Sequence, residues 1–281
     1  MPTTEHEFTT ATPDGQLVGW LREADDAKDN ALLLHGGPGL SEYLSTLANE
    51  LDSVVTTARY QQRGLAPSAV AGDASIEGHV ADAVAVMDAL GWQKPIVIGH
   101  SWGGHLALHL AAAHPDRVGA LVILDALGAT GDGGQAEFGP ALRAGLSATD
   151  LARLEELEAI EEPTEDEQRQ HLGTLWPQYF GDPASAPPMP PLQFATNGGD
   201  TWASIQAHFE ARTLERALPG MSMPTLIVHG SRSPIPIEQA EQMAALMPNA
   251  TFVVHDGKGH WAWLEEPCFI RAEMEGFLAS G

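Results

Sequence analysis

The chain has 281 residues, 43% of them hydrophobic, which is enough to bury the core of one main domain that carries an insertion. Its 14 basic and 38 acidic residues give a net charge of −24, which disfavours nucleic acid or an anionic membrane as a partner because both would be repelled. Nothing approaches the roughly 18 unbroken apolar residues of a membrane span.

Glu5 and Glu7 stand where a secretory signal would need positive charge and then an apolar stretch, so we expect no such signal.

Short β-branched runs alternate with amphipathic helical stretches along most of the chain, which predicts a parallel sheet covered on both faces. The turn at 13–15 is short and suits a hairpin. The elements expected over the first ninety residues are strands at 5–10, 17–24, 31–34 and 54–60 and helices at 41–51 and 74–90.

Residues 99–103 read Gly-His-Ser-Trp-Gly, between an apolar run at 95–98 and a stretch of helical periodicity at 104–110. This is the Gly-x-Ser-x-Gly pattern in its strand-to-helix setting, where the sharp turn forces the middle residue into strained backbone geometry. Ser101 would then project its hydroxyl at the edge of the sheet. The first amides of the following helix would face an anion that forms on a carbonyl oxygen.

The alternation of strands and helices stops after a strand at 120–124, which ends in Asp125. Residues 128–218 contain glycine clusters, a proline-rich run and glutamate-rich helical segments, and we interpret them as a helical cap. The core would then comprise residues 1–127 and 219–281. The elements expected in its second part are strands at 225–229 and 251–255, a helix at 237–246 and a final helix after Pro267.

Four segments make the chain resemble the α/β-hydrolase fold and, within it, the proline iminopeptidase-like branch. They are His35-Gly36-Gly37-Pro38-Gly39, Gln62-Arg63-Gly64 followed by Ser68, the run from Gly99 to Gly104, and Gly259-His260. The resemblance implies an α/β fold whose mostly parallel, eight-stranded sheet has helices on both faces and an inserted helical cap. It also implies that Ser101 is the nucleophile, that His260 is the general base, and that the amides of Gly37 and Trp102 form the oxyanion hole.

The expected roles have physical reasons. A serine hydroxyl is a poor nucleophile near neutral pH unless an imidazole accepts its proton, and the same imidazole later protonates the leaving group. Gly37 has no side chain to block a substrate carbonyl, so its amide could face Ser101. Such a mechanism needs neither a metal nor an organic cofactor, and the scattered histidines lack the spacing of metal ligands.

The acid of the triad is where the sequence departs from the family pattern. An aspartate is expected shortly after the strand at 225–229, but the chain reads His-Gly-Ser-Arg-Ser-Pro there, with Ser233 in its place. One explanation moves the acid to Asp125, which keeps the chain order of nucleophile, acid and histidine. A second is that Ser233 cripples a hydrolase. A third is that the site has left acyl transfer and uses His260 to move protons in a cyclase or lyase reaction.

The cap is expected to decide the substrate. In iminopeptidases, cap glutamates bind the free amine of the substrate, and Glu210 loosely matches one such site. Aromatic side chains of the cap could line an apolar pocket or form the core of the cap. They are Trp176, Tyr179, Phe180, Trp202 and Phe209.

These observations lead to a cytoplasmic serine hydrolase that acts on a small ester, an amide or an N-terminal peptide bond through an acyl-serine intermediate. The substrate would be a small molecule or a short peptide. The cytoplasm is expected because one cysteine, Cys268, permits no intrachain disulfide. The alternatives are a non-hydrolytic enzyme on the same scaffold and a binding protein with an impaired triad.

Overall fold

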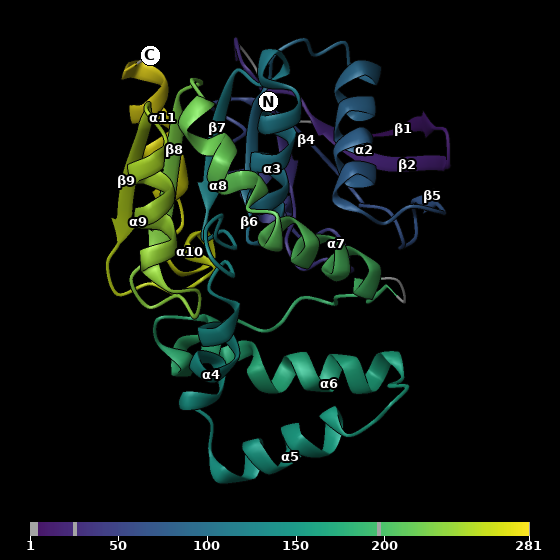
Figure 1. Cartoon of the computed structure of the whole chain (residues 1–281), viewed down its shortest axis with the longest axis vertical. Helices are drawn as coiled ribbons and strands as arrows, with labels where there is room; N and C mark the ends of the chain where they lie inside the picture. The colour runs from purple at the N-terminus through teal and green to yellow at the C-terminus, as the bar shows by residue number, and fades with distance from the viewer. Residues whose placement is uncertain (1–4, 25–26, 196–197, 281) are drawn as a thin grey trace.

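The computed structural model describes residues 5–24, 27–195 and 198–280, so the first four residues of the N-terminal segment and two residues of the expected cap lie outside it. A twisted sheet runs through the centre, with the strand order β1-β2-β4-β3-β6-β7-β8-β9 (Figure 1). Its strands are β1 (Glu5–Thr12), β2 (Gly15–Arg22), β3 (Asn30–Leu34), β4 (Thr56–Tyr60), β6 (Ile96–His100), β7 (Ala120–Leu124), β8 (Thr225–Gly230) and β9 (Ala250–His255).

The six strands from β4 to β9 along this path are parallel, whereas β1 and β2 form an antiparallel hairpin at one edge. A short ninth strand, β5 (Ala69–Val70), pairs with β2. Every residue of β6, β7 and β8 is buried, because helices cover both faces of the sheet and leave no side for polar residues. The predicted α/β-hydrolase fold class is confirmed, but the described residues form nine strands rather than the predicted eight, because the short β5 adds to the edge beside β2.

Helices pack on both faces of the sheet. On one face, α2 (Ile76–Ala89), α3 (Trp102–Ala113) and α9 (Ile237–Leu246) contribute to one apolar cluster. On the other face, α1 (Ser45–Glu50) and α11 (Phe269–Ser280) contribute to a second, together with the short α10 (Ala262–Glu265). Helix α1 begins later than the sequence predicts because Ser41 donates its amide to Gln193 and Leu40 forms a β-bridge with Phe194.

The segment predicted to form the cap has two parts in the structure. Helices α4 (Gln135–Ala144), α5 (Ala148–Glu158) and α6 (Glu165–Leu175) extend beyond the sheet (Figure 1). Helices α7 (Gly198–Glu210) and α8 (Thr213–Ala217) instead pack against α2 and α3, and Ile205 and Leu214 join the apolar cluster on that face. The part that projects over the end of the sheet is therefore α4–α6 with the residues that follow it.

No helix within the described part of the chain is both long and apolar enough to cross a membrane.

Candidate active site

Ser101 lies on the sharp turn between β6 and α3. Its backbone has φ 56° and ψ −123°, a region that L residues rarely adopt, as the sequence predicts for this position. Close approach of the flanking chain makes the turn possible. A Cβ on Gly99 would lie 2.2 Å from the carbonyl oxygen of Gly103, and a Cβ on Gly103 would lie 1.9 Å from the carbonyl oxygen of Leu34. Only glycine fits at either position, so the pattern is needed to build the turn itself.

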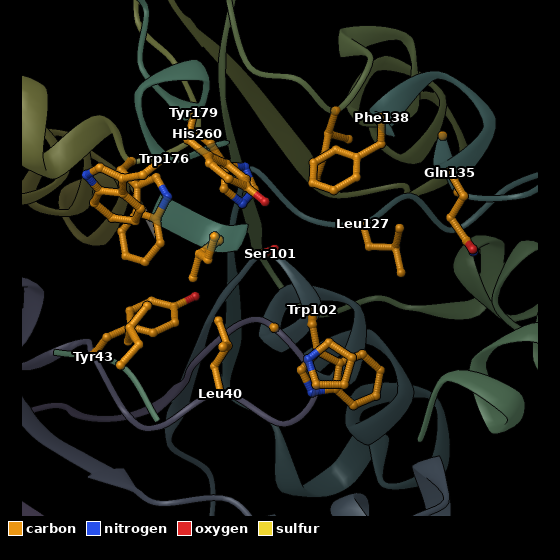
Figure 2. A pocket seen from close by; sticks show the side chains of 18 of the residues that line it. Leu40, Tyr43, Ser101, Trp102, Leu127, Gln135, Phe138, Trp176, Tyr179 and His260 are labelled. Carbon is orange, nitrogen blue, oxygen red and sulfur yellow. The ribbon is translucent and has the colours of Figure 1, made fainter. Parts of the chain in front are cut away.

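A cavity of about 210 Å³ opens between the end of the sheet and the cap, and Ser101 and His260 both lie on its wall (Figure 2). Gly37 and Trp102 also line it, so the structure brings together four of the five residues predicted to form the triad and the oxyanion hole. The rest of the wall is almost entirely apolar and aromatic. It consists of Pro38, Leu40, Tyr43, Leu127, Gly133, Gly134, Gln135, Phe138, Leu172, Trp176, Tyr179, Leu192, Trp202, Ile235 and Trp261.

The loop after β3 is held against the turn at Ser101. A Cβ on Gly36 would lie only 2.6 Å from the Cβ of Ser101, so the two backbones are almost in contact. Gln62 connects the same elements, because its side-chain amide donates to the carbonyl of His35 (2.8 Å) and its oxygen accepts from the indole N–H of Trp102 (3.0 Å). These contacts fix the positions of the amides at Gly37 and Trp102 relative to the hydroxyl of Ser101.

Tyr43 and His100 form a buried chain of hydrogen bonds between the loop after β3 and the loop of His260. The hydroxyl of Tyr43 accepts from the amide of Gly36 (2.7 Å) and donates to Nδ1 of His100 (2.7 Å), and Nε2–H of His100 donates to the carbonyl of His260 (2.8 Å). Burial lowers the pKa of His100 to about 3, so its ring is neutral and keeps this arrangement of donors and acceptors at neutral pH. No sequence pattern pointed to Tyr43.

His260 follows β9 and is only 3% exposed. Its amide donates to the carbonyl of Tyr179 (2.7 Å), in the turn η2 (Trp176–Tyr179) that follows α6. Nδ1 of its ring lies 3.4 Å from Oγ of Ser233. Among the described residues this is the one hydrogen-bond partner of the ring, so Nε2 is left for the cavity. Burial lowers the pKa of His260 well below its usual range, and the ring is therefore unprotonated at neutral pH and able to accept a proton.

Glu265 joins the turn after α6 to the loop of His260. Its carboxylate accepts hydrogen bonds from the amides of Gly259 (2.6 Å) and Gly181 (3.0 Å). No local sequence pattern identifies this residue, because the two amides come together only in the folded chain.

Asp125 directly follows β7 and is 2% exposed, with a backbone φ of 42°. Its carboxyl oxygen Oδ1 accepts from the amide of Gly230 (3.0 Å), and the side chain of Ser233 lies near enough to lower the pKa of the carboxyl. Burial raises the pKa of Asp125, against the opposing effect of these two donors. Within the described residues, Asp125 makes no hydrogen bond to His260. The nearest polar group of this part of the chain to Nδ1 of His260 is the hydroxyl of Ser233.

Of the predicted substrate-binding residues Glu210, Trp202 and Phe209, the structure brings only Trp202 to the cavity. Phe209 is buried and packs on the ring of His105, with 5.1 Å between centroids. Glu210 is exposed at the end of α7. It is not among the residues that line the cavity, and it lies eight residues, about 12 Å of axial rise, along the helix from Trp202. Trp176 and Tyr179 line the cavity, whereas Phe180 is buried beside it.

A family model described as "alpha/beta hydrolase fold" matches residues 32–267. The chain belongs to this family. It is similar to a 2-hydroxymuconate semialdehyde hydrolase of Pseudomonas putida, with 30% identity over 89% of this chain and 86% of the relative. It is also similar to a putative esterase/lipase of Haemophilus influenzae, with 26% identity over 88% of this chain and 82% of the relative.

Solved structures agree on the alpha/beta hydrolase fold. An alpha/beta fold family hydrolase from Bacillus anthracis superposes with a TM-score of 0.77 at 16% identity, covering 97% of this chain and 99% of the other. A proline iminopeptidase of Mycobacterium smegmatis superposes with a TM-score of 0.71 at 22% identity, covering 98% of each chain. The curated relatives that the chain matches over most of its length carry hydrolase names, which supports an enzyme.

Proposed function

We propose that the protein is a serine hydrolase that cleaves small, uncharged esters with an apolar acyl group through an acyl-serine intermediate. The observation that carries this proposal is the placement of Ser101 and His260 on the wall of one apolar cavity. The strained turn presents the hydroxyl of Ser101, and among the described residues the only ring nitrogen of His260 with a hydrogen-bond partner is Nδ1, which faces Ser233.

The reaction follows from these positions. Nε2 of His260 accepts the proton of Ser101 as Oγ attacks the ester carbonyl, and the amides of Gly37 and Trp102 stabilise the negative charge on the carbonyl oxygen. The tetrahedral intermediate collapses when the protonated ring gives its proton to the departing alcohol. Water then enters with His260 as base, attacks the acyl-serine, and the collapse of the second intermediate releases the acid and restores the hydroxyl of Ser101.

The lining of the cavity favours an uncharged substrate. None of the described residues that line it is Asp, Glu, Lys or Arg. An ammonium or carboxylate group buried there would lose its hydration without gaining an ionic partner, which is strongly unfavourable. The resemblance to iminopeptidases predicted that Glu210 binds the free amine of the substrate. Glu210 is exposed, so it does not offer a buried carboxylate to an ammonium group. The Pseudomonas putida relative is named for a muconate semialdehyde, which is a carboxylate. None of the described residues that line this cavity is a Lys or Arg that could pair with such a group.

A fluorophosphonate probe and a small substrate panel test the proposal. We expect the probe to label Ser101 in the native enzyme, as peptide mapping would show, and to label neither Ser101→Ala nor His260→Ala. Aryl esters whose acyl group carries no charge should have a kcat/KM at least ~10²-fold higher than prolyl anilide, which carries an ammonium group, or an aryl monoester of a dicarboxylic acid, which carries a free carboxylate. The reason is that a charge left unpaired in the cavity costs about 3 kcal/mol or more.

Other outcomes of that panel identify the other candidates. Cleavage of prolyl anilide alone would establish an iminopeptidase and overturn the preference for uncharged substrates. Absence of both labelling and ester hydrolysis would contradict the serine hydrolase. It would favour the second candidate, a non-hydrolytic enzyme or binding protein, for which the specific support is Ser233 at the position where the family places an acid.

The pH dependence follows from the low pKa of His260. The base form of the ring is the neutral form, and burial lowers the pKa, so the base form persists below pH 6.5. We expect kcat/KM for an uncharged aryl ester to stay on its plateau through pH 6.5 and to fall only as the pH drops further. A midpoint above pH 7 on the acid side would contradict this assignment.

A further inference from the structure

The hydroxyl of Tyr179 is an unused polar group on the wall of the cavity. Tyr179 lines the cavity, and its hydroxyl points inward beside the ring of His260 (Figure 2). Among the described residues this hydroxyl has no hydrogen-bond partner, and burial alone raises its pKa to about 13. The hydroxyl therefore keeps its hydrogen at neutral pH and is free to donate it.

Most other polar side chains of the wall are already bonded within the protein. The hydroxyl of Tyr43 is bonded on both sides, to an amide and to an imidazole. The indole N–H of Trp102 donates to Gln62 (3.0 Å), and that of Trp176 donates to the carbonyl of Pro187 (2.7 Å). These groups hold the wall together and have no hydrogen left for a ligand.

The remaining N–H groups of the described wall are less suited to a ligand. Nε2 of Gln135 and Nε1 of Trp261 lack partners, but both atoms are covered by neighbouring atoms. Trp202 is 38% exposed, so solvent reaches its side chain. The hydroxyl of Tyr179 is therefore the side-chain donor that the wall offers to a bound molecule, apart from Ser101 and His260.

An unpaired hydroxyl on an apolar wall favours a ligand with a matching acceptor. A hydroxyl shut away from water without a partner is destabilising, and the loss is recovered when a bound molecule accepts its hydrogen. Small-molecule sites are typically apolar, with a few placed polar groups that fix the orientation of the ligand. An uncharged oxygen of the substrate would meet this condition without bringing a charge into the cavity.

Contacts with the loop of His260 hold Tyr179 in place. The carbonyl of Tyr179 accepts from the amide of His260 (2.7 Å), and a Cβ on Gly259 would lie 2.2 Å from that carbonyl oxygen. The ring centroid of Tyr179 is 5.5 Å from that of His260 and 6.0 Å from that of Phe138. Because His260 gives its proton to the departing alcohol, the part of the substrate nearest Tyr179 is the alcohol part.

We propose that the hydroxyl of Tyr179 selects esters whose alcohol part carries an uncharged oxygen acceptor, such as an ether or a carbonyl oxygen. This inference rests on the proposed hydrolase function and assigns Tyr179 as a specificity-determining residue of the same site. The hydroxyl donates a hydrogen bond to that oxygen and keeps its proton throughout the reaction.

Pairs of isosteric aryl esters measure this hydrogen bond. Methoxyphenyl and ethylphenyl butanoates differ by an oxygen in place of a methylene, and the ortho, meta and para pairs scan its position. We expect Tyr179→Phe to lower kcat/KM about 5- to 50-fold more for at least one methoxyphenyl ester than for its ethylphenyl partner. Differences in intrinsic reactivity cancel, because each ester is compared with itself in two enzymes.

The kinetic constant that changes separates recognition from damage to the site. A hydrogen bond to an oxygen away from the reacting carbonyl is made in the ground state and in the transition state alike, so its loss should raise KM more than it lowers kcat. A displaced His260 would instead lower kcat, and it would do so for both esters of a pair.

Tyr60→Phe is the matched control. The hydroxyl of Tyr60 is also buried without a partner among the described residues, but Tyr60 lies in the core and does not line the cavity. This variant should leave the ratio of kcat/KM between the two esters of each pair unchanged. Phenyl methoxyacetate and phenyl butanoate place the oxygen in the acyl part instead, and for them Tyr179→Phe should not change the ratio.

The outcomes distinguish this inference from the hydrolase function. Equal losses within every methoxyphenyl and ethylphenyl pair would overturn the role of Tyr179, and a loss confined to the acyl pair would overturn its place on the alcohol side. If no ester is hydrolysed, binding of the same esters to Ser101→Ala can be followed by the fluorescence of the tryptophans that line the cavity. A preference in Kd for the methoxyphenyl ester that disappears in Ser101→Ala/Tyr179→Phe would uphold the selectivity while the hydrolase function fails. A preference that stays the same in both variants would overturn it.

Discussion

Replacing Ser101 by alanine should lower kcat toward an uncharged aryl ester by about 10⁴- to 10⁶-fold, because the nucleophile is lost while the cavity and the oxyanion donors remain. His260→Ala should lower kcat by a similar factor, since the hydroxyl of Ser101 then lacks its base. The double variant should lose little more than either single variant, because the two residues act as one unit. Initial rates at saturating substrate measure all three. A double variant that loses the product of the two single losses would show that they act independently.

Stability separates the chemical role of Ser101 from its structural one. Alanine keeps the strained backbone at this position, so Ser101→Ala should unfold at the same temperature as the wild type. Ser101→Gly removes the strain and should raise the free energy of unfolding by about 1–3 kcal/mol while being equally inactive. A Ser101→Gly variant less stable than Ser101→Ala would contradict the strained turn.

Gly103→Ala should destabilise the whole fold. The added Cβ would lie 1.9 Å from the carbonyl oxygen of Leu34 and 2.7 Å from that of His35, and neither backbone group can move without disturbing β3 and the loop after it. We expect the free energy of unfolding to fall by about 3 kcal/mol or more, with a melting temperature at least ~6 °C lower. Urea titration and thermal unfolding followed by circular dichroism measure the change.

The matched control for that experiment is Gly276→Ala in α11. Gly276 is exposed, and a Cβ there would meet no atom within 4 Å, so the substitution should be neutral or stabilise by up to about 1 kcal/mol. Equal effects of the two substitutions would show that the close approach at Gly103 is not needed.

The part of the site that could be predicted is the part that short stretches of sequence determine. The turn at Ser101 needs glycine on both sides, a buried strand before it and a helix after it, and all of these are visible within about fifteen residues. Gly37 and His260 were predicted from the resemblance to the α/β-hydrolase fold, and each follows a strand of a parallel sheet, whose carboxyl ends meet at one edge. The mostly parallel sheet could be predicted because its central strands are uninterrupted apolar runs.

What could not be predicted depends on contacts between distant segments. The sequence shows that Ser233 stands at the position of an acid and that Asp125 follows β7, but not that Nδ1 of His260 lies 3.4 Å from Oγ of Ser233. The chain from Gly36 through Tyr43 to His100 likewise joins three segments that no local pattern relates. These hydrogen bonds are set by the packing of whole strands and loops.

The substrate-contacting residues of the cap were the least predictable. Glu210 and Phe209 were selected by a short pattern and by their residue type, but which side of a helix meets the cavity depends on how that helix packs. Helix α7 lies along α2 and α3, so Phe209 is drawn into the core and Glu210 remains in solvent. Trp202 lies nearer the start of the same helix and does reach the cavity.

Rapid-quench mass spectrometry of the acyl-enzyme tests the central claim most directly. When enzyme is mixed with an excess of an uncharged aryl ester and quenched with acid within milliseconds, the intact mass should rise by that of one acyl group, and peptide mapping should place the group on Ser101. The adduct should form in step with a burst of the released phenol and should be absent from His260→Ala. Steady hydrolysis with no adduct, or an adduct on a residue other than Ser101, would contradict the account.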